Sequence, residues 1–186
     1  FDRFSLEIPD GEFCIFAGVS GCGKTTLLNM IGALEPVDGG SIIVNGTDVT
    51  RRKNRRGYLR HTVGFLFQNF ALVDNKTVRE NLKLVKNDCR SDISPEEALA
   101  RVGLADKLDQ KVYSLSGGEQ QRVALARLMI KRCTLVLADE PTGSLDRQNA
   151  ERVFDLLEML QGMGKTVLMA THDETFQQKG KRVIKL

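Results

Sequence analysis

A glycine-rich stretch between two apolar segments constrains the fold of this chain more than any other feature. Residues 18–26 read GVSGCGKTT, residues 12–17 read EFCIFA and residues 26–31 read TLLNMI. This order predicts a buried strand, a tight turn and a helix, and the turn has the spacing GxxxxGK[ST]. Glycines let consecutive backbone N–H groups point inward, and the helix adds the positive end of its dipole. The stretch therefore predicts a phosphate-binding loop at a helix N-terminus.

The side chains of this loop have separate expected tasks. Lys24 should reach the β and γ phosphates of a nucleotide, and Thr25 should offer its hydroxyl to the accompanying Mg²⁺. A glycine-rich turn that merely contains Lys and Thr is the alternative, whereas a dinucleotide site lacks the third glycine of GxGxxG. The residues predicted to surround the phosphates are Gly18, Val19, Ser20, Gly21, Cys22, Gly23, Lys24, Thr25 and Thr26.

A second buried strand is predicted to end in two carboxylates. Residues 133–138 read CTLVLA and are followed by Asp139, Glu140 and Pro141. Two acidic groups at the end of a buried strand are costly unless they have partners. Asp139 is expected to hold Mg²⁺ through a water, and Glu140 to orient the water that attacks the γ phosphate. A solvated acidic turn is the alternative, but it does not explain the order of strand, Asp, Glu and Pro.

A third segment, LSGGEQ at residues 115–120, precedes the apolar stretch QRVALARLMI at residues 121–130. Ser116, Gly117 and Gly118 should therefore lie at a helix N-terminus with free N–H groups and little side-chain cover. The segment has no evident task within its own subunit. A site divided between two copies of the chain would give it one.

Together these motifs resemble those of the nucleotide-binding ATPase subunit of an ABC transporter. LSGGEQ is similar to that family's signature and LVLADE to its Walker B strand. Gln68 in FLFQN resembles the Q-loop residue, Ser144-Leu145-Asp146 the D-loop, and His172 in ATHDE the switch histidine. The motifs follow the family's order and cover nearly the whole chain.

The resemblance implies an ATPase that works as a head-to-tail homodimer with two composite sites. In the family, the signature residues, here Ser116, Gly117, Gly118 and Glu119, close over ATP that is bound by the opposite subunit. By the same resemblance, Asp146 joins the two sites, and His172 contacts the γ phosphate and Glu140. Gln68 meets Mg²⁺ and the attacking water. The expected cofactors are ATP and Mg²⁺.

Narrower similarities suggest the cellular task. LADEPTGSLD and SGGEQQRVALAR resemble the subgroup for lipoprotein release and for macrolide and peptide export. FLFQNFALVDNKTVRENL is similar to ATPases of lactococcin-type bacteriocin exporters. The implied partner is a transmembrane permease, with the ATPase at the cytoplasmic face of the membrane. Residues 70–73 are a candidate docking surface, and ordinary packing is their alternative. A mechanotransmitting or regulatory ATPase that moves no cargo is a second possible function, and a DNA-repair or translation ATPase a third.

The coarse pattern predicts one α/β domain over residues 1–186. Its class is a P-loop NTPase core, with a mainly parallel sheet, helices on both faces, an antiparallel N-terminal β subdomain and a helical subdomain inserted at about 70–115. Capping boxes are expected at Thr77 with Glu80 and at Ser94 with Glu97. The expected strands are 4–8, 12–17, 41–45, 62–67, 135–138, 166–170 and 182–186, with turns at Asp10-Gly11 and Asn45-Gly46.

Composition limits the other function classes. A net charge of +3 is too small to indicate nucleic-acid binding, and no apolar run approaches the roughly 20 residues that cross a bilayer. The basic run at residues 51–56 is expected to be a solvated loop, with anionic lipid or an acidic partner as the alternative. The four cysteines show no CxxC pairing and no histidine nearby in the sequence, so neither a disulfide framework nor a structural metal is expected. Phe1 and Phe4 are interpreted as hairpin core, so no residue is assigned to adenine stacking.

Overall fold

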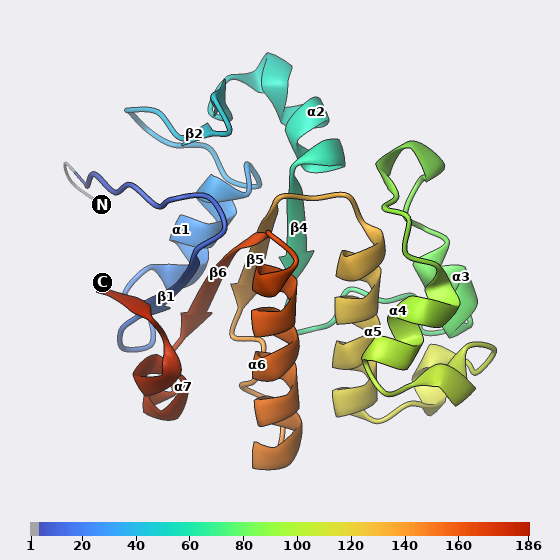
Figure 1. Ribbon diagram of the computed structural model, residues 1–186. Helices are drawn as coiled ribbons and strands as arrows, with labels where there is room; N and C mark the ends of the chain where they lie inside the picture. The colour runs from blue at the N-terminus through green and yellow to red at the C-terminus, as the bar shows by residue number, and fades with distance from the viewer. Residues whose placement is uncertain (1–3) are drawn as a thin grey trace.

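A computed structural model describes residues 4–186, and its centre is a five-stranded sheet (Figure 1). The strand order is β4-β5-β6-β1-β7, and all neighbouring strands in this sheet are parallel. A separate hairpin pairs β2 with β3 in antiparallel fashion. The strands are β1 (Phe13–Ala17), β2 (Ile43–Val44), β3 (Thr47–Asp48), β4 (Val63–Leu66), β5 (Leu135–Asp139), β6 (Thr166–Thr171) and β7 (Arg182–Lys185).

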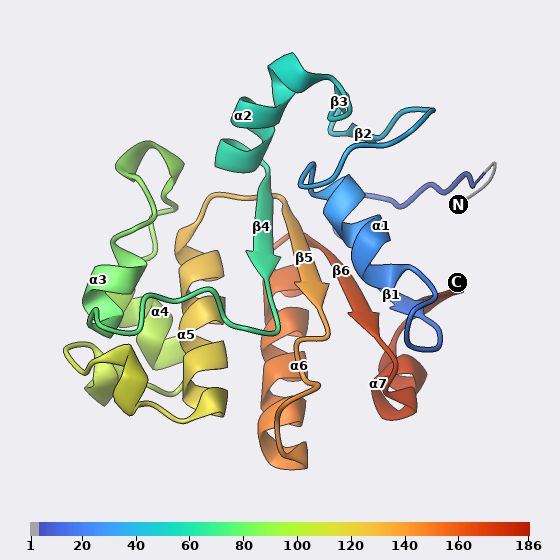
Figure 2. The ribbon, with the colours of Figure 1, turned by 180° about the vertical axis from the view of Figure 1, so that it is seen from behind.

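Helices cover both faces of the sheet, as the views from front and back show (Figures 1 and 2). The α-helices are α1 (Lys24–Ile31), α2 (Arg52–His61), α3 (Val78–Leu82), α4 (Pro95–Arg101), α5 (Gly117–Ile130), α6 (Arg147–Gly162) and α7 (Glu174–Lys179). Three short 3₁₀ helices are η1 (Asn87–Cys89), η2 (Ala105–Lys107) and η3 (Val112–Ser114). The predicted fold class, a mainly parallel sheet between helices with a small antiparallel sheet, is confirmed.

Strand β1 explains why two hydrophobic cores form. Each of its five residues is buried, and successive side chains of a strand point to opposite faces. Phe13 and Ile15 pack in the core that includes α5, α6 and α7. Cys14 and Phe16 pack in the second core, with α1 and Tyr58 of α2. A strand that is buried on both faces needs a continuous apolar sequence, and FCIFA supplies it.

Several predicted elements differ from the structure. Residues 4–8, predicted as a strand, form no strand, and 41–45 contributes only the two residues of β2. A ladder needs a neighbouring strand with free backbone groups; Leu6 and Ile8 instead pack partly buried against the second core. Phe1, expected in a hairpin core, lies outside the described residues, and Phe4, expected with it, is 43% exposed and in no hairpin. The Asn45-Gly46 turn is confirmed, because both residues have positive φ, at 48° and 71°, and join β2 to β3.

The basic run is also corrected, since residues 52–61 form helix α2 and not a loop. Arg and Lys are good helix formers, and their side chains face solvent on this helix. Tyr58 anchors the helix: it is 3% exposed, and its hydroxyl donates to Ile31 O at 2.8 Å. One buried aromatic residue in ten gives too little apolar periodicity for a sequence prediction.

The segment between β4 and α5 is built from short helices. Thr77 and Glu80 form the predicted capping box at the start of α3. Ser94 caps α4 by accepting from the Glu97 N–H, but the Glu97 carboxylate pairs with Arg101 at 2.7 Å. Throughout residues 4–186, every helix is too short or too polar to cross a bilayer.

Candidate functional site

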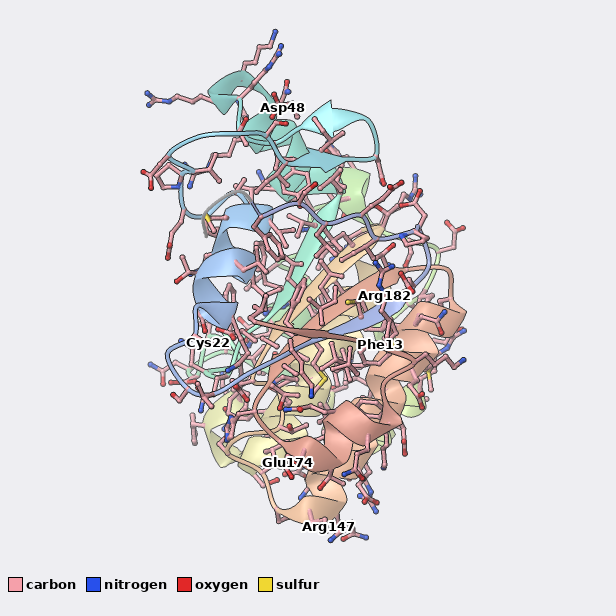
Figure 3. All side chains as sticks on the ribbon, turned by 90° about the vertical axis from the view of Figure 1, so that its left-hand side faces the viewer. Phe13, Cys22, Asp48, Arg147, Glu174 and Arg182 are labelled. Carbon is pink, nitrogen blue, oxygen red and sulfur yellow. The ribbon has the colours of Figure 1, made fainter. Side chains whose placement is uncertain are left out.

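The predicted phosphate loop joins the buried end of β1 to the beginning of α1 (Figure 3, where Cys22 is labelled). Gly21 and Gly23 have φ of 83° and 100°, which L side chains rarely adopt. A Cβ at Gly18 would lie 2.6 Å from Cys22 Sγ, so the loop curls tightly at its start. The chain path therefore needs these glycines.

Lys24 closes this loop from within. Its side chain is 6% exposed, and its Nζ donates to Gly18 O at 2.9 Å and to Val19 O at 3.0 Å. The same Nζ lies 3.8 Å from Glu140 Oε1. An ammonium group is thus held at the helix N-terminus, where negative phosphate oxygens are favoured.

Thr25 and Asp139 meet although 114 positions separate them in the sequence. Thr25 Oγ1 donates to Asp139 Oδ1 at 3.0 Å, because parallel packing of β1, β6 and β5 brings both strand ends to one edge. Burial raises the pKa of Asp139, the Thr25 hydrogen bond opposes this, and the nearby Glu140 charge raises the pKa further. A hydroxyl and a carboxylate side by side are the oxygen ligands that Mg²⁺ prefers, so the residues present fit that ion.

Glu140 follows β5 in a strained conformation. Its φ is 43°, and its N–H donates to Ala170 O at 3.0 Å, which ties the turn to β6. Oε1 lies 3.0 Å from His172 Nδ1. Oε2 is buried and accepts no hydrogen bond from the described residues. Positive φ at a non-glycine residue costs on the order of 1–3 kcal/mol and is concentrated at functional sites.

Gln68 is exposed and follows β4, which is the strand next to β5. A Cβ built at Gly143 would lie 3.8 Å from both Gln68 Nε2 and Glu140 Cβ. The Gln68 amide and the Glu140 side chain therefore flank the same turn. His172 joins them from the end of β6, with 62% of its side chain exposed.

The LSGGEQ segment forms the start of α5, as predicted, but the Ser116 N–H, which was expected to be free, is hydrogen-bonded. Ser116 is the N-cap and accepts from Glu119 N at 3.3 Å, while Glu119 Oε2 accepts from Ser116 N at 2.8 Å. This reciprocal capping box occupies the Ser116 N–H, since Glu119 stands three residues on. Gly117 is exposed, whereas Gly118 is buried against Asn149.

Asp146 lies with this helix start and not with the phosphate loop. It caps α6 and accepts from Asn149 N at 3.0 Å and from Asn149 Nδ2 at 2.6 Å. These hydrogen bonds, first that of the Asn149 backbone, lower the pKa of Asp146. Asn149 Oδ1 in turn accepts from Arg122 of α5 at 2.8 Å. The starts of α5 and α6 are thereby linked.

Asn149 was not singled out from the sequence. A Cβ at Gly118 would lie 2.7 Å from Asn149 Cγ, so the two helices approach as closely as glycine permits. The available signal was its place three residues after Asp146, where a capped helix presents an N–H to its N-cap. Arg127 was also missed: it donates to Ala71 O at 2.7 Å and holds a turn in which Phe70 and Ala71 both have positive φ.

The predicted site residues thus form two groups within the chain. The phosphate loop, Asp139, Glu140, His172 and Gln68 lie at the carboxyl ends of the parallel strands. The α5 start and Asp146 form the other group. In Figures 1 and 2, α1 and α5 lie on opposite sides of β5 and β6. A single chain therefore separates its glycine-rich helix tip from its phosphate loop.

Comparisons with known proteins agree with this geometry. The family model described as ABC transporter matches residues 1–143. The chain is 41% identical to the lipoprotein-releasing system ATP-binding protein LolD of Ehrlichia chaffeensis, covering 98% of this chain and 81% of LolD. It is 39% identical to the macrolide export ATP-binding/permease protein MacB of Campylobacter jejuni, covering 98% of this chain but only 30% of MacB.

A solved structure is similar in both fold and sequence. It is the dimeric post-hydrolysis state of the ATP-binding cassette MJ0796 bound to ADP and Pi, with a TM-score of 0.82 and 34% identity. The match covers 97% of this chain and 83% of that one. Because the sequence motifs, the arrangement of the sheet and these relatives agree, the chain belongs to the ABC transporter family, as an ATP-binding domain that hydrolyses ATP.

Proposed function

We propose that this chain is the motor of an ABC exporter and works as a head-to-tail dimer with two composite ATP sites. The observation that carries the proposal is the separation of the α5 start from the phosphate loop within one chain. Ser116, Gly117, Gly118 and Glu119 would contact ATP only from a second copy. The MJ0796 cassette, which is similar in fold and sequence, is described as dimeric.

Each residue of the first group has a proposed role in hydrolysis. Lys24 and the N–H groups of residues 18–26 bind the phosphates, and Thr25, Asp139 and Gln68 hold Mg²⁺. When bound, Mg²⁺ neutralises charge on the phosphate oxygens. The buried Glu140 Oε2 has capacity to accept a hydrogen bond from the attacking water, while His172 Nδ1 fixes the orientation of Oε1.

The second group has the proposed task of closing the site. Gly117 and Gly118 would present the first turn of α5, with its positive dipole end, to the γ phosphate of the partner copy. Asp146, linked to that turn through Asn149, would connect the two sites of the dimer. This role fits the position of Asp146, the N-cap of α6, which lies beside the start of α5 and away from the phosphate loop.

We further propose that residues 70–115 form a helical subdomain and that a transmembrane permease docks beside it, at the cytoplasmic face of the membrane. A groove between core and helices is lined by Leu59, Phe65, Phe67, Leu84 and Arg127. The adjoining residues 70–73 differ in burial: Leu72 packs against the core, whereas Val73 is 42% exposed. Val73 is thus the large apolar side chain of this segment that a partner would cover.

The cargo is proposed to be a peptide of the bacteriocin class. LolD and MacB carry names for lipoprotein release and macrolide export, which supports an export role. The alternative is a mechanotransmitting or regulatory ATPase that moves no cargo. Reconstitution with its membrane partner in vesicles separates the two: peptide accumulation that depends on ATP supports export, and ATP turnover without accumulation supports the alternative.

The dimer is tested with Glu140→Gln, which retains the side-chain size but removes the charge. We expect this variant to bind ATP, lose turnover by about 100-fold or more, and run as a dimer with ATP and Mg²⁺ in light scattering. A Lys24→Ala, Glu140→Gln double variant is the matched control and should stay monomeric. If Glu140→Gln binds ATP and remains monomeric, the composite site is wrong.

A further inference from the structure

Three side chains with metal-ligating atoms meet outside the nucleotide site. His61 ends α2, whereas Asp88 and Cys89 belong to η1. Cys89 Sγ lies 3.8 Å from His61 Nδ1 and 3.5 Å from Asp88 Oδ1, and the three ligand atoms lie within 4.8 Å of one another. In Figures 1 and 2 the segment after α3 rises toward α2. The cluster thus bridges the core and the helices inserted between β4 and α5.

The spacing of these atoms suits a tetrahedral ion. Zinc bonds of about 2.3 Å to sulfur and 2.0–2.1 Å to nitrogen or oxygen put two tetrahedral ligands about 3.6 Å apart. The two separations from the sulfur, 3.8 Å to His61 Nδ1 and 3.5 Å to Asp88 Oδ1, lie on either side of that value. The His61 nitrogen and the Asp88 oxygen lie within 4.8 Å of each other, and a tetrahedral ion would hold them about 3.4 Å apart, so binding would also fix this third separation.

Neighbouring contacts hold the ligands in place. Asp88 uses its other oxygen, Oδ2, in an ion pair with Arg60, which leaves Oδ1 toward the sulfur. Cys89 O accepts from Arg132 N at 2.7 Å, and Cys89 N donates to Lys86 O at 2.9 Å. Such outer contacts orient metal ligands and strengthen binding.

Two of the three ligands are exposed, so a metal ion can approach the cluster from solvent. Cys89 is 4% exposed, whereas His61 and Asp88 are exposed. An ion could therefore reach the sulfur from the solvent side and keep a water as fourth ligand. The cluster differs from an isolated thiol, because a sulfur, an imidazole nitrogen and a carboxylate oxygen lie within 4.8 Å of one another.

We propose that His61, Asp88 and Cys89 form a three-ligand binding site for a borderline divalent ion, with Zn²⁺ as the ion that the donor set favours. Sulfur, imidazole and carboxylate together suit Zn²⁺, while Mg²⁺ and Ca²⁺ take oxygen ligands. Binding releases the Cys89 thiol proton to solvent, since the thiolate is the ligand. The ion would tie α2 to η1 and so restrain the inserted helices relative to the core.

Cobalt(II) titration of the purified full chain tests the site, because thiolate coordination gives a near-ultraviolet charge-transfer band. We expect a band that saturates at one ion per chain and is displaced by Zn²⁺. Cys89→Ser should abolish it, and His61→Ala and Asp88→Asn should each weaken affinity by at least about tenfold. Cys22→Ser, which changes the half-buried cysteine of the phosphate loop, is the matched control and should retain the band.

A thermal melt with Zn²⁺ gives an independent measurement. Binding to the folded chain alone should raise Tm, and His61→Ala, which alters an exposed residue, should lose that rise while its Tm without metal stays near that of the parent. If the parent chain shows no band, or if the band survives in Cys89→Ser, the proposal is overturned and the cluster is a hydrogen-bonded contact only. Unchanged affinity in His61→Ala would overturn it equally.

Discussion

Glu140 occupies a backbone conformation that few residues other than glycine adopt. The strain at φ 43° is held by its N–H bond to Ala170 O and by the His172 contact to Oε1. These contacts place Oε2 in a buried position without a partner among residues 4–186. The sequence predicted a carboxylate after a buried strand, but the strain and the unpartnered oxygen follow from β5 and β6 lying side by side.

Cys22 gives a prediction at the level of one side chain. Cys14, Cys89 and Cys133 are buried, whereas Cys22 is partly exposed in the phosphate loop, with Lys24 Nζ 4.0 Å from its sulfur. A maleimide attached there would block the phosphates. We expect N-ethylmaleimide to inhibit ATP hydrolysis at least about tenfold and ATP to protect, because reactivity follows exposure and positive surroundings.

The Cys22→Ser variant completes that experiment. It should keep its ATPase activity and become resistant to the reagent. Inhibition of Cys22→Ser to the same extent as the parent would show that another group reacts, and would contradict the assignment to the loop.

At the level of elements, the starts of α5 and α6 form one unit through Asn149. Asn149 bonds Asp146 at the α6 N-cap and Arg122 on α5, and its amide packs on Gly118. The sequence predicted a helix N-terminus at Ser116, whereas Asp146 was interpreted only as the D-loop residue and not as the N-cap of α6. It did not indicate that one asparagine joins them, since helix crossing depends on tertiary packing.

The close approach at Gly118 can be measured by a double-mutant cycle. Gly118→Ala should lower the free energy of unfolding by about 1–2 kcal/mol, because the new methyl group overlaps Asn149 and outweighs the gain in helix propensity. Adding Asn149→Ala should cost less than the sum of the two changes, with a coupling of at least about 0.5 kcal/mol in urea unfolding.

Gly57→Ala is the matched control for that cycle. Gly57 lies in α2 with nothing within 4 Å of a built Cβ, so this change should be neutral or stabilise by up to about 1 kcal/mol. Strict additivity of Gly118→Ala and Asn149→Ala would mean that the two residues do not contact each other in solution.

For the whole molecule, the important feature is that the phosphate loop with its neighbouring side chains and the α5 start with Asp146 occupy different places in the fold. The parallel sheet collects Thr25, Asp139, Glu140 and His172 at one edge, while α5 begins on the far side of β5 and β6. In the proposed dimer, each chain would contribute one half of two different sites. The Gln121 side chain donates to Pro141 O at 2.8 Å, which fixes the α5 start beside the turn after β5 and away from the loop between β1 and α1.

Mixing two inactive variants tests this arrangement directly. Lys24→Ala removes the phosphate lysine, and Gly117→Asp places a negative charge on the α5 tip, where the helix dipole tolerates it but a triphosphate does not. Each variant alone should be inactive. An equal mixture should recover about one quarter of the parent ATPase rate, because half of the dimers are mixed and each holds one intact site.

The control for the mixture is a chain that carries both changes. Mixed with either single variant, it should restore no ATPase activity, because it supplies neither an intact phosphate loop nor an intact α5 tip. Absence of recovery in the mixture of Lys24→Ala and Gly117→Asp, with mixed dimers verified by mass, would contradict sharing of the site between copies.

The sequence alone determined the parts that depend on local order. The phosphate loop, the strand ending in Asp139 and Glu140, the Thr77 capping box and the Asn45-Gly46 turn are each set by residues within a few positions of one another. Tertiary structure decided the rest: helix α2 rests on Tyr58, residues 4–8 find no strand partner, and His61 meets Cys89 across 28 positions. The reason is physical, because burial and contacts between distant segments depend on how the sheet and helices pack, and a local pattern carries no information about which distant segment will be its neighbour.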